Sequence, residues 1–348
     1  MSEGECVPKK KRPEKIKLAI VGCGGHAGYH AQQVHSNSDL MEVVALCDIK
    51  RDNLENYHRN KFGAEAKIRL YDSMDDLMRD PPPGLRAVSL VTPHTTHFEQ
   101  SMAALDHGYD VMCEKPMVTR SEHAQELAQK VASSGRQFQI AFQAPFTAEF
   151  AYIRDAIARG DLGELQTINA FSCQGWRNAT RGTWRQDPKQ SGGGQMYDSG
   201  AHVFNSIAWL IDRPVEEVFC VSDNKGTAVD INAAMTIRWE GGVLGSVSIS
   251  GNTPGWQEGI WVAGEKGRIS TGIHGGRLEH IDAEKGLIKY PQVTQENYTP
   301  LQNFALCLQG KAKPRCGVRY GILHSWLMDA LYKSAAQGKP VKLSKPPL

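Results

Sequence analysis

Three short segments of this chain carry side chains whose types and spacing could do chemistry. The first is the glycine-rich 22–27 (GCGGHA), the second is 114–116 (EKP), and the third is 198–202 (DSGAH). A lysine, a carboxylate and an imidazole together can hold a hydroxyl oxygen and manage its proton. Beside a nicotinamide, this set could move a hydride to or from a carbinol carbon.

The glycine segment has the features of a dinucleotide-binding turn. It follows an apolar run and opens a helix-length stretch over 26–36. Gly22 permits the tight turn, Gly24 lets the backbone approach a pyrophosphate, and Ala27 permits close packing of helix on strand. Gly25 and His26 lie between them and belong to the same predicted site. The alternative is a glycine-rich turn that binds nothing.

An acid ends the next apolar run and indicates which cofactor is bound. Asp48 lies about 20 residues past the glycine segment, the distance at which a carboxylate binds the adenosine ribose hydroxyls. A carboxylate there repels a 2′-phosphate, so NAD is favoured over NADP.

Two further segments, 92–97 and 114–116, follow predicted strands of the same sheet, and the second contains Lys115. In open parallel sheets, ligands bind beyond the carboxyl ends of the strands. These segments should therefore face the nicotinamide, with the lysine holding a substrate oxygen. A solvated surface charge is the alternative for that lysine. The expected contacts are Thr92, Pro93, His97, Glu114 and Lys115.

A helix predicted over 195–211 carries the third segment. It would place Asp198, His202, Asn205 and Trp209 on one polar face beside an apolar stripe. The glycines at 192–194 would let the helix start approach a ligand. The alternative is an acid favoured by the helix dipole plus an incidental histidine.

Aromatic and basic residues precede this helix. Trp176, Arg177, Trp184 and Arg185 could bind a polyhydroxylated ring through aromatic faces and guanidinium forks. Equally, the two tryptophans could belong to the core.

The elements that must position these segments fall into two halves. Residues 17–143 alternate strand and helix signals, which predicts a Rossmann domain with a parallel sheet covered on both faces. The expected strands there are 17–22, 42–48, 86–91, 110–114 and 137–143, and the expected helices are near 26–36, 51–62, 94–107 and 120–134.

After Pro145 the pattern becomes rich in strands, which predicts a second α+β domain with a large, mostly antiparallel open sheet. Its expected strands are 165–173, 215–223, 232–239, 243–250, 258–263 and 267–271, with helices at 150–159, 301–309 and 319–337. We therefore expect a disordered basic leader over 1–14, a dinucleotide-binding domain over 15–144, and a substrate-binding and oligomerisation domain over 145–348.

Composition excludes several classes of protein. The net charge of +2 gives no reason to expect nucleic acid as a partner, and no apolar run is long enough to span a membrane. The eight cysteines show no CxxC or metal-ligand spacing, so we expect reduced thiols, no metal site and a cytoplasmic location.

Taken together, these motifs make the chain resemble the Gfo/Idh/MocA family of sugar and inositol oxidoreductases. The resemblance rests on the glycine segment with His30, Thr92-Pro93 with His97, Glu114-Lys115-Pro116, Gly192-Gly193-Gly194, Asp198-x-Gly-x-His202 and Trp209-Leu210. It implies Lys115 and His202 as a catalytic pair with Asp198 binding substrate, and a homodimer or homotetramer formed through the open sheet. His94, Asn205 and Gln143-Ala144-Pro145 depart from the family pattern, which puts substrate contacts in doubt rather than the hydride chemistry.

The expected activity is NAD-dependent hydride transfer with a secondary hydroxyl or ketone of a sugar, inositol or glycoside. One alternative is a redox-neutral glycoside-processing enzyme that forms a transient keto sugar. A second, from a different class, is a catalytically inactive regulatory protein that binds a nucleotide.

Overall fold

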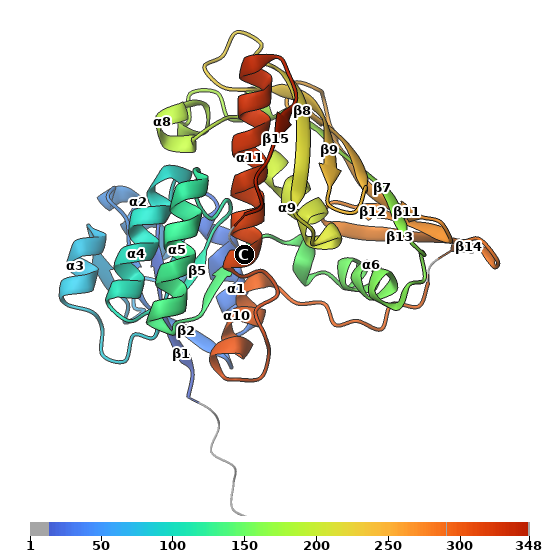
Figure 1. The fold of residues 1–348 in the computed structure, drawn as a ribbon. Helices are drawn as coiled ribbons and strands as arrows, with labels where there is room; N and C mark the ends of the chain where they lie inside the picture. The colour runs from blue at the N-terminus through green and yellow to red at the C-terminus, as the bar shows by residue number, and fades with distance from the viewer. Residues whose placement is uncertain (1–13, 290, 347–348) are drawn as a thin grey trace, which may run out of the picture.

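The computed structural model describes residues 14–289 and 291–346 as two β-sheets with helices packed on and between them (Figure 1). The expected basic leader, apart from Glu14, lies outside the described residues.

The first sheet has six parallel strands in the order β3-β2-β1-β4-β5-β6. Its buried, near-continuous apolar strands are typical of a sheet covered on both faces. The strand order reverses between β1 and β4, and the loops that follow these strands form the crevice where ligands bind in such sheets. The strands are β1 (Ile16–Val21), β2 (Met41–Cys47), β3 (Arg69–Tyr71), β4 (Ala87–Leu90), β5 (Asp110–Cys113) and β6 (Phe138–Ile140).

The helices of this half follow the predicted alternation and confirm the Rossmann architecture. They are α1 (Ala27–Ser36), α2 (Arg51–Lys61), α3 (Met74–Arg79), the 3₁₀ turn η1 (His94–Thr96), α4 (His97–Asp106) and α5 (Ser121–Ser134). β3 and α3 were not predicted, because an edge strand of three residues with one buried side chain has no readable periodicity.

The second sheet has nine strands in the order β14-β13-β12-β11-β7-β10-β9-β8-β15 within the described residues. Only the central β7–β10 pair is parallel, which confirms a mostly antiparallel sheet. β13, β14 and β15 were not predicted. The strands are β7 (Leu165–Gln174), β8 (Val215–Asp223), β9 (Asn232–Trp239), β10 (Leu244–Ser250), β11 (Trp256–Gly264), β12 (Gly267–Gly272), β13 (Gly275–Asp282), β14 (Gly286–Lys289) and β15 (Val341–Lys342).

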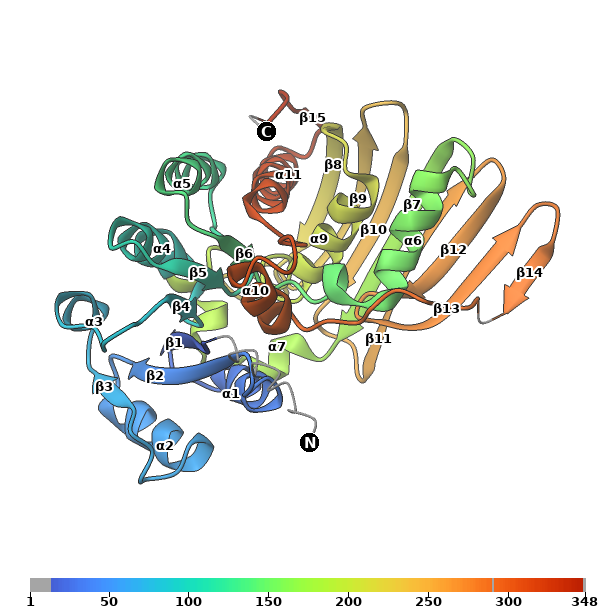
Figure 2. The same cartoon turned by 90° about the horizontal axis from the view of Figure 1, so that it is seen from below.

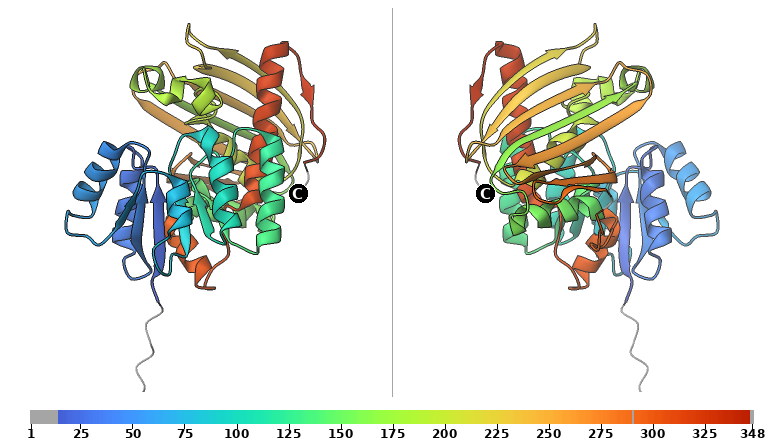
Figure 3. Two further views of the ribbon diagram at one scale, coloured as in Figure 1. Left: turned by 90° about the vertical axis from the view of Figure 1, so that its left-hand side faces the viewer. Right: turned by 90° about the vertical axis from the view of Figure 1, so that its right-hand side faces the viewer.

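Helices cover one face of this sheet and leave the other open (Figures 2 and 3). Alternate residues such as Ile168, Met235 and Ile260 point inward and are buried with the helices in one core. The packed helices include α6 (Ala148–Arg159), α9 (Gly200–Ile211) and α11 (Val318–Gln337), while the short α7 (Trp176–Ala179), η3 (Trp184–Gln186) and α8 (Pro188–Ser191) lie in the connection between β7 and α9.

The end of the chain joins the two sheets. α10 (Pro300–Leu308) contributes Leu301 and Phe304 to the core beside β1 and α1, and α11 packs on both α5 and β8. In Figure 1 the red α11 stands between the two sheets. The expected boundary after residue 144 remains a prediction, with α10 a C-terminal segment that packs on the first sheet.

Candidate active site

The glycine segment forms an open turn between β1 and α1. Gly22 has φ +94°, and a Cβ there would meet the carbonyl oxygen of Val91 at 2.4 Å, so only glycine fits. Cβ atoms on Gly24 and Gly25 would meet no described atom within 4 Å. The amides of Gly24, Gly25 and His26 donate no hydrogen bond to a described residue. Free amides at a helix N-terminus fit a pyrophosphate.

The carboxylate of Asp48 is bound to this turn. One oxygen accepts a hydrogen bond from the amide of Cys23 at 2.7 Å, and the other accepts from the amide of Lys50 at 2.8 Å. Asp48 therefore lies beside the glycine turn, as predicted, and also holds that turn in place.

Buried Glu114 lies at the centre of a cluster with two histidines, of which His30 is buried and His26 is exposed. Its Oε1 is 3.1 Å from Nε2 of His26 and 2.7 Å from Nε2 of His30, and its Oε2 accepts from the amide of Lys115. Burial would raise the pKa of Glu114, but the hydrogen bonds from both histidines outweigh it and keep the pKa well below its ordinary value.

This cluster joins the glycine turn to the end of β5. Ligand-type atoms of its three side chains lie within 4.8 Å of one another. The hydrogen bonds account for that arrangement without an ion, and the expectation of no metal stays a prediction.

His97 braces the two loops that follow β4 and β5. Its ring nitrogens lie 2.8 Å from the carbonyl oxygen of Pro116 and 3.0 Å from that of Thr92, and the side chain is buried. Thr92 also donates to Gln100 at 2.5 Å. Pro93 caps η1 beside them. His97 thus contacts backbone groups of its neighbours, so any effect on a cofactor would be indirect.

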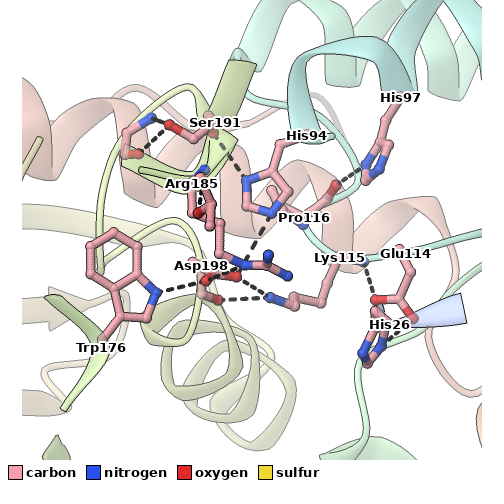
Figure 4. A network of polar contacts seen from close by, with 12 residues as sticks. His26, His94, His97, Glu114, Lys115, Pro116, Trp176, Arg185, Ser191 and Asp198 are labelled. Atoms are coloured by element: carbon pink, nitrogen blue, oxygen red, sulfur yellow. Dashed lines mark hydrogen bonds and ion pairs between the residues drawn. The ribbon is translucent and has the colours of Figure 1, made fainter. Parts of the chain in front are cut away.

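Lys115 and Asp198 form a buried ion pair between the two sheets (Figure 4). Nζ of Lys115 donates to Oδ1 of Asp198 at 2.8 Å and to the backbone carbonyl oxygen of Asp198 at 3.0 Å. An ammonium has three protons, so one remains free for a substrate oxygen. The solvated-lysine alternative is wrong, since this side chain is only 12% exposed.

The other oxygen of Asp198 accepts from the indole of Trp176 at 2.7 Å and from Nε of Arg185 at 3.0 Å. Burial would raise the pKa of Asp198, but the positive charges of Lys115 and Arg185 lower it far below the ordinary value. The carboxylate therefore stays ionised.

Asp198 lies in a turn, not on the helix. α9 begins at Gly200 rather than at 195, so the prediction that Asp198 and His202 share a helix face is wrong. Asn205 and Trp209 are buried within α9. The predicted polar face of this helix therefore does not line a cleft. Of the four residues predicted on that face, only His202 points from the helix toward the site.

The physical reason lies in a distant aspartate. Buried Asp230 accepts hydrogen bonds from the amides of Gly194 and Met196, both at 2.8 Å, and its carbonyl oxygen accepts from the amide of Gln195 at 2.9 Å. A Cβ on Gly194 would lie 2.0 Å from the carbonyl oxygen of Asp230. These bonds hold the backbone of 194–196 in a turn, and the ladder after it is irregular, since the amide of Gly200 bonds to the carbonyl oxygen of Gln195 five residues back instead of four.

The predicted aromatic and basic residues are divided between core and site. Trp176 is buried and touches the site only through its indole nitrogen. Trp184 is partly exposed, with the guanidinium of Arg185 4.6 Å from its ring centre. For Arg177 the structure gives backbone hydrogen bonds, one of them to Gly251, and no side-chain contact among the described residues.

His202 lies beside a second histidine. Its ring centre is 4.8 Å from that of His274 and 6.0 Å from that of Phe142. Burial and the positive charge of Lys115, together with the proximity of His274, hold the pKa of His202 well below its ordinary value, so the ring is neutral at pH 7. Its ring makes no hydrogen bond to a described residue.

His94 completes the inner wall of the site. Nδ1 lies 3.0 Å from the carbonyl oxygen of Ser191, and Nε2 lies 3.9 Å from Oδ1 of Asp198. The ring packs edge-on against Trp184 at 4.8 Å. Burial and the charge of Lys115 lower the pKa of His94 to about 3. As a neutral ring it donates from Nδ1 and offers Nε2 as an acceptor.

Sequence reasoning missed several residues of the site. Glu258 and His274 come from β11 and the β12–β13 turn, and Asp230 precedes β9. His324 of α11 is buried near Phe142, and its ring nitrogens have no partner among the described residues. None of these residues lies in a motif, and only the fold brings them to the three segments.

A Rossmann sheet with a free glycine turn, joined to a second sheet by a buried lysine–aspartate pair, defines a dinucleotide-binding protein with an acid–base site. Residues 16–142 match the family model of the oxidoreductase family with an NAD-binding Rossmann fold. Residues 150–270 match the Gfo/Idh/MocA C-terminal domain. The chain belongs to the Gfo/Idh/MocA family, whose members are NAD-binding oxidoreductases.

Relatives include an inositol 2-dehydrogenase of Rubrobacter xylanophilus, 25% identical over 265 residues, which are 74% of this chain and 71% of the relative. A D-glucoside 3-dehydrogenase of Escherichia coli is 24% identical over 94% of this chain and 97% of its own. Among solved structures, the WlbA dehydrogenase of Bordetella pertussis, in complex with NADH and UDP-GlcNAcA, superposes with TM-score 0.80 at 23% identity, over 95% of this chain and 99% of that one.

Proposed function

We propose that this chain transfers a hydride between NAD and a secondary hydroxyl or ketone of a sugar, inositol or glycoside. The observation that carries the proposal is the buried Lys115–Asp198 pair, which leaves one ammonium proton free beside neutral His202. The family assignment supplies the cofactor, and the names of the relatives agree with a polyhydroxylated substrate.

The chain offers a fitting place for NAD. The free amides of Gly24, Gly25 and His26 would hold the pyrophosphate, and Asp48 would accept from the ribose hydroxyls. When bound, NAD supplies the hydride acceptor for oxidation. Thr92, Pro93, Glu114 and Lys115 would surround its nicotinamide end.

The roles of the catalytic side chains follow from their charges. Lys115 donates a hydrogen bond to the substrate hydroxyl oxygen and stabilises the negative charge that develops there. His202 is neutral and accepts the hydroxyl proton as the hydride leaves the carbon. Asp198 pairs with the ammonium of Lys115 and fixes its direction, while His94, Trp184, Arg185 and Arg177 would bind the remaining hydroxyls.

The test compares Lys115→Ala with wild type on a panel of sugars, inositols and glycosides. We expect NADH formation by wild type with at least one polyol, and a loss of about 10²–10⁴ in kcat for the variant. The NAD affinity of the variant should stay within about twofold of the wild-type value, because Lys115 takes no part in the glycine turn that would hold the pyrophosphate.

Lys67→Ala is the matched control, since Lys67 is an exposed lysine of the same domain. Mass spectrometry of the products runs beside the absorbance assay. New product without net NADH would favour the redox-neutral alternative, and a folded wild type that binds NAD but converts nothing in the panel would favour the regulatory one.

Two further proposals concern the setting of the enzyme. No helix in the described part of the chain is long and apolar enough to cross a membrane. A homo-oligomer built on the open sheet and a location in the cytoplasm both remain predictions.

A further inference from the structure

Trp256 is an exposed aromatic residue on the helix-covered face of the second sheet. Its side chain is 59% exposed, although it shares the parity of Glu258 and Ile260 on β11, whose side chains point toward the helices. Trp261 has the opposite parity and belongs to the outer face. Trp256 therefore stands at the uncovered end of the inner face, beyond the helices.

This tryptophan lies one side chain further out than the proposed base. Its ring centre is 5.9 Å from that of His274, which in turn is 4.8 Å from that of His202. The three rings thus run from the inside of the site to its rim.

His274 is fixed in this row by Glu258. Oε1 of Glu258 accepts from the amide of His274 at 3.0 Å and lies 2.9 Å from its Nδ1. Nε2 of His274 makes no hydrogen bond to a described residue, and the side chain is 29% exposed. A ring held through one nitrogen leaves the other available to a ligand hydroxyl.

A second polar group stands beside Trp256. Gln174 is its register partner on β7, so the two side chains are neighbours on the same face. Gln174 is only 7% exposed, and its Nε2 has no partner among the described residues. A buried amide without a partner costs free energy unless a ligand or water satisfies it.

We propose that Trp256, Gln174 and His274 form a second subsite that binds another ring of the substrate, an inference that rests on the proposed function. The enzyme would then act on glycosides or disaccharides. A pyranose ring has an apolar C–H face that packs on an indole and hydroxyls at its edge that bond to amide and imidazole nitrogens. The ring being oxidised lies at His202 and Lys115, and its glycosidic partner lies on Trp256.

The chemistry around Trp256 favours a carbohydrate ring over a second copy of this chain. A protein interface on this spot would leave Gln174 and His274 facing apolar side chains, whereas the other exposed tryptophan, Trp261, lies on the opposite face with Leu244 and Val221. Trp256 therefore lies beside polar side chains, whereas Trp261 lies on a face with other exposed apolar side chains.

The experiment measures kcat/KM with saturating NAD for a hexose and for the disaccharide that carries it at its non-reducing end. We expect wild type to prefer the disaccharide, and Trp256→Ala to reduce that preference about tenfold. Gln174→Ala should reduce it in the same direction. Trp261→Ala, on the same strand but the outer face, is the control and should keep the wild-type preference. Calorimetric titration of the disaccharide onto the NAD-loaded protein runs in parallel.

Each outcome decides between the two proposals. Disaccharide binding that depends on Trp256 without any hydride transfer would support the subsite and contradict the proposed function. Equal kcat/KM for both sugars, unchanged by Trp256→Ala, would overturn the subsite while the function stands. Dissociation of a homo-oligomer by Trp256→Ala, but not by Trp261→Ala, would also overturn it, because Trp256 would then bind a second copy.

Discussion

The imidazole of His202 stands in surroundings whose net effect disfavours a second proton, although the carboxylates of Glu114 and Asp198 act in the opposite direction. It is buried, Lys115 carries a positive charge nearby, and His274 adds to that effect. A base for alcohol oxidation must be neutral, so these surroundings keep His202 competent over a wide pH range. The protonated imidazole that would serve as the acid in reduction is correspondingly scarce near neutral pH.

The pH profile of oxidation follows from this depressed pKa. Because a histidine with a lowered pKa loses its neutral form only well below pH 6.5, kcat/KM should stay flat as the pH falls from 8 to 6.5. Initial rates of NADH formation with saturating NAD check this. An acidic limb with its midpoint at or above 6.5, absent in His202→Ala, would contradict the prediction.

Asp48 has two roles that one substitution can separate. Asp48→Asn keeps an oxygen for the amide of Cys23 and removes the negative charge that a 2′-phosphate would meet. We expect NAD to bind more tightly than NADP to wild type, and the gap to narrow by roughly 1.5–3 kcal/mol in the variant. Fluorescence titration with both reduced cofactors measures it. Equal affinities of wild type for NAD and NADP would contradict the prediction. Asp48→Ala should weaken the binding of both cofactors, because it loosens the glycine turn.

At the scale of elements, one turn decides where the carboxylate of Asp198 lies. The turn between α8 and α9 is bound to Asp230, which accepts from two amides of the turn and from the hydroxyl of Tyr332. Helix α11 is thereby linked to this turn through Tyr332. The position of Asp198 thus depends on a strand and a helix far along the chain.

Removing one acceptor from Asp230 should loosen this turn. In Asp230→Asn an amide N–H faces a donor, so the free energy of unfolding should fall by about 1–3 kcal/mol. kcat should fall with it, while NAD affinity stays near that of wild type. Urea unfolding and steady-state kinetics test this, with Asp223→Asn as the exposed control. If the Asp230→Asn variant kept the wild-type stability and kcat, the turn would not depend on Asp230.

The sequence predicts most of this architecture but not the turn. Apolar runs and glycine stops predict the strands and helices of the first sheet, and Gly241-Gly242 predicts the β9–β10 hairpin, because these signals are local. The start of α9 was misplaced, because Asp230 fixes the turn at 194–196 from outside the segment and the hydrogen-bond ladder before Gly200 is irregular. β14 and β15 were missed because each is a short edge strand without periodicity, and β13 because its eight residues include only two large apolar side chains, Leu278 and Ile281. Glu258 and His274 reach the site only through sheet pairing.

On the scale of the whole molecule, the two faces of the second sheet have different roles. The inner face packs on helices and carries the proposed subsite, whereas no helix of the described residues covers the outer face (Figure 3). Val221, Leu244 and Trp261 are exposed on that outer face. Large exposed apolar side chains on an uncovered sheet are typical of a surface that binds protein.

We therefore expect a homo-oligomer whose contact is this outer face. A charged side chain placed in an apolar contact must be buried without a partner, which costs several kcal/mol and weakens a symmetric interface twice. Leu244→Lys combined with Trp261→Lys should convert the oligomer to monomers at micromolar concentration, as measured by sedimentation velocity. Ile49→Lys is the control, because Ile49 is an 86% exposed apolar residue after β2 on the first sheet. The active site lies on the inner face, so isolated monomers should keep NAD affinity. If the wild-type protein sediments as a monomer, this contact does not form. If the oligomer survives both substitutions, the contact lies on another surface.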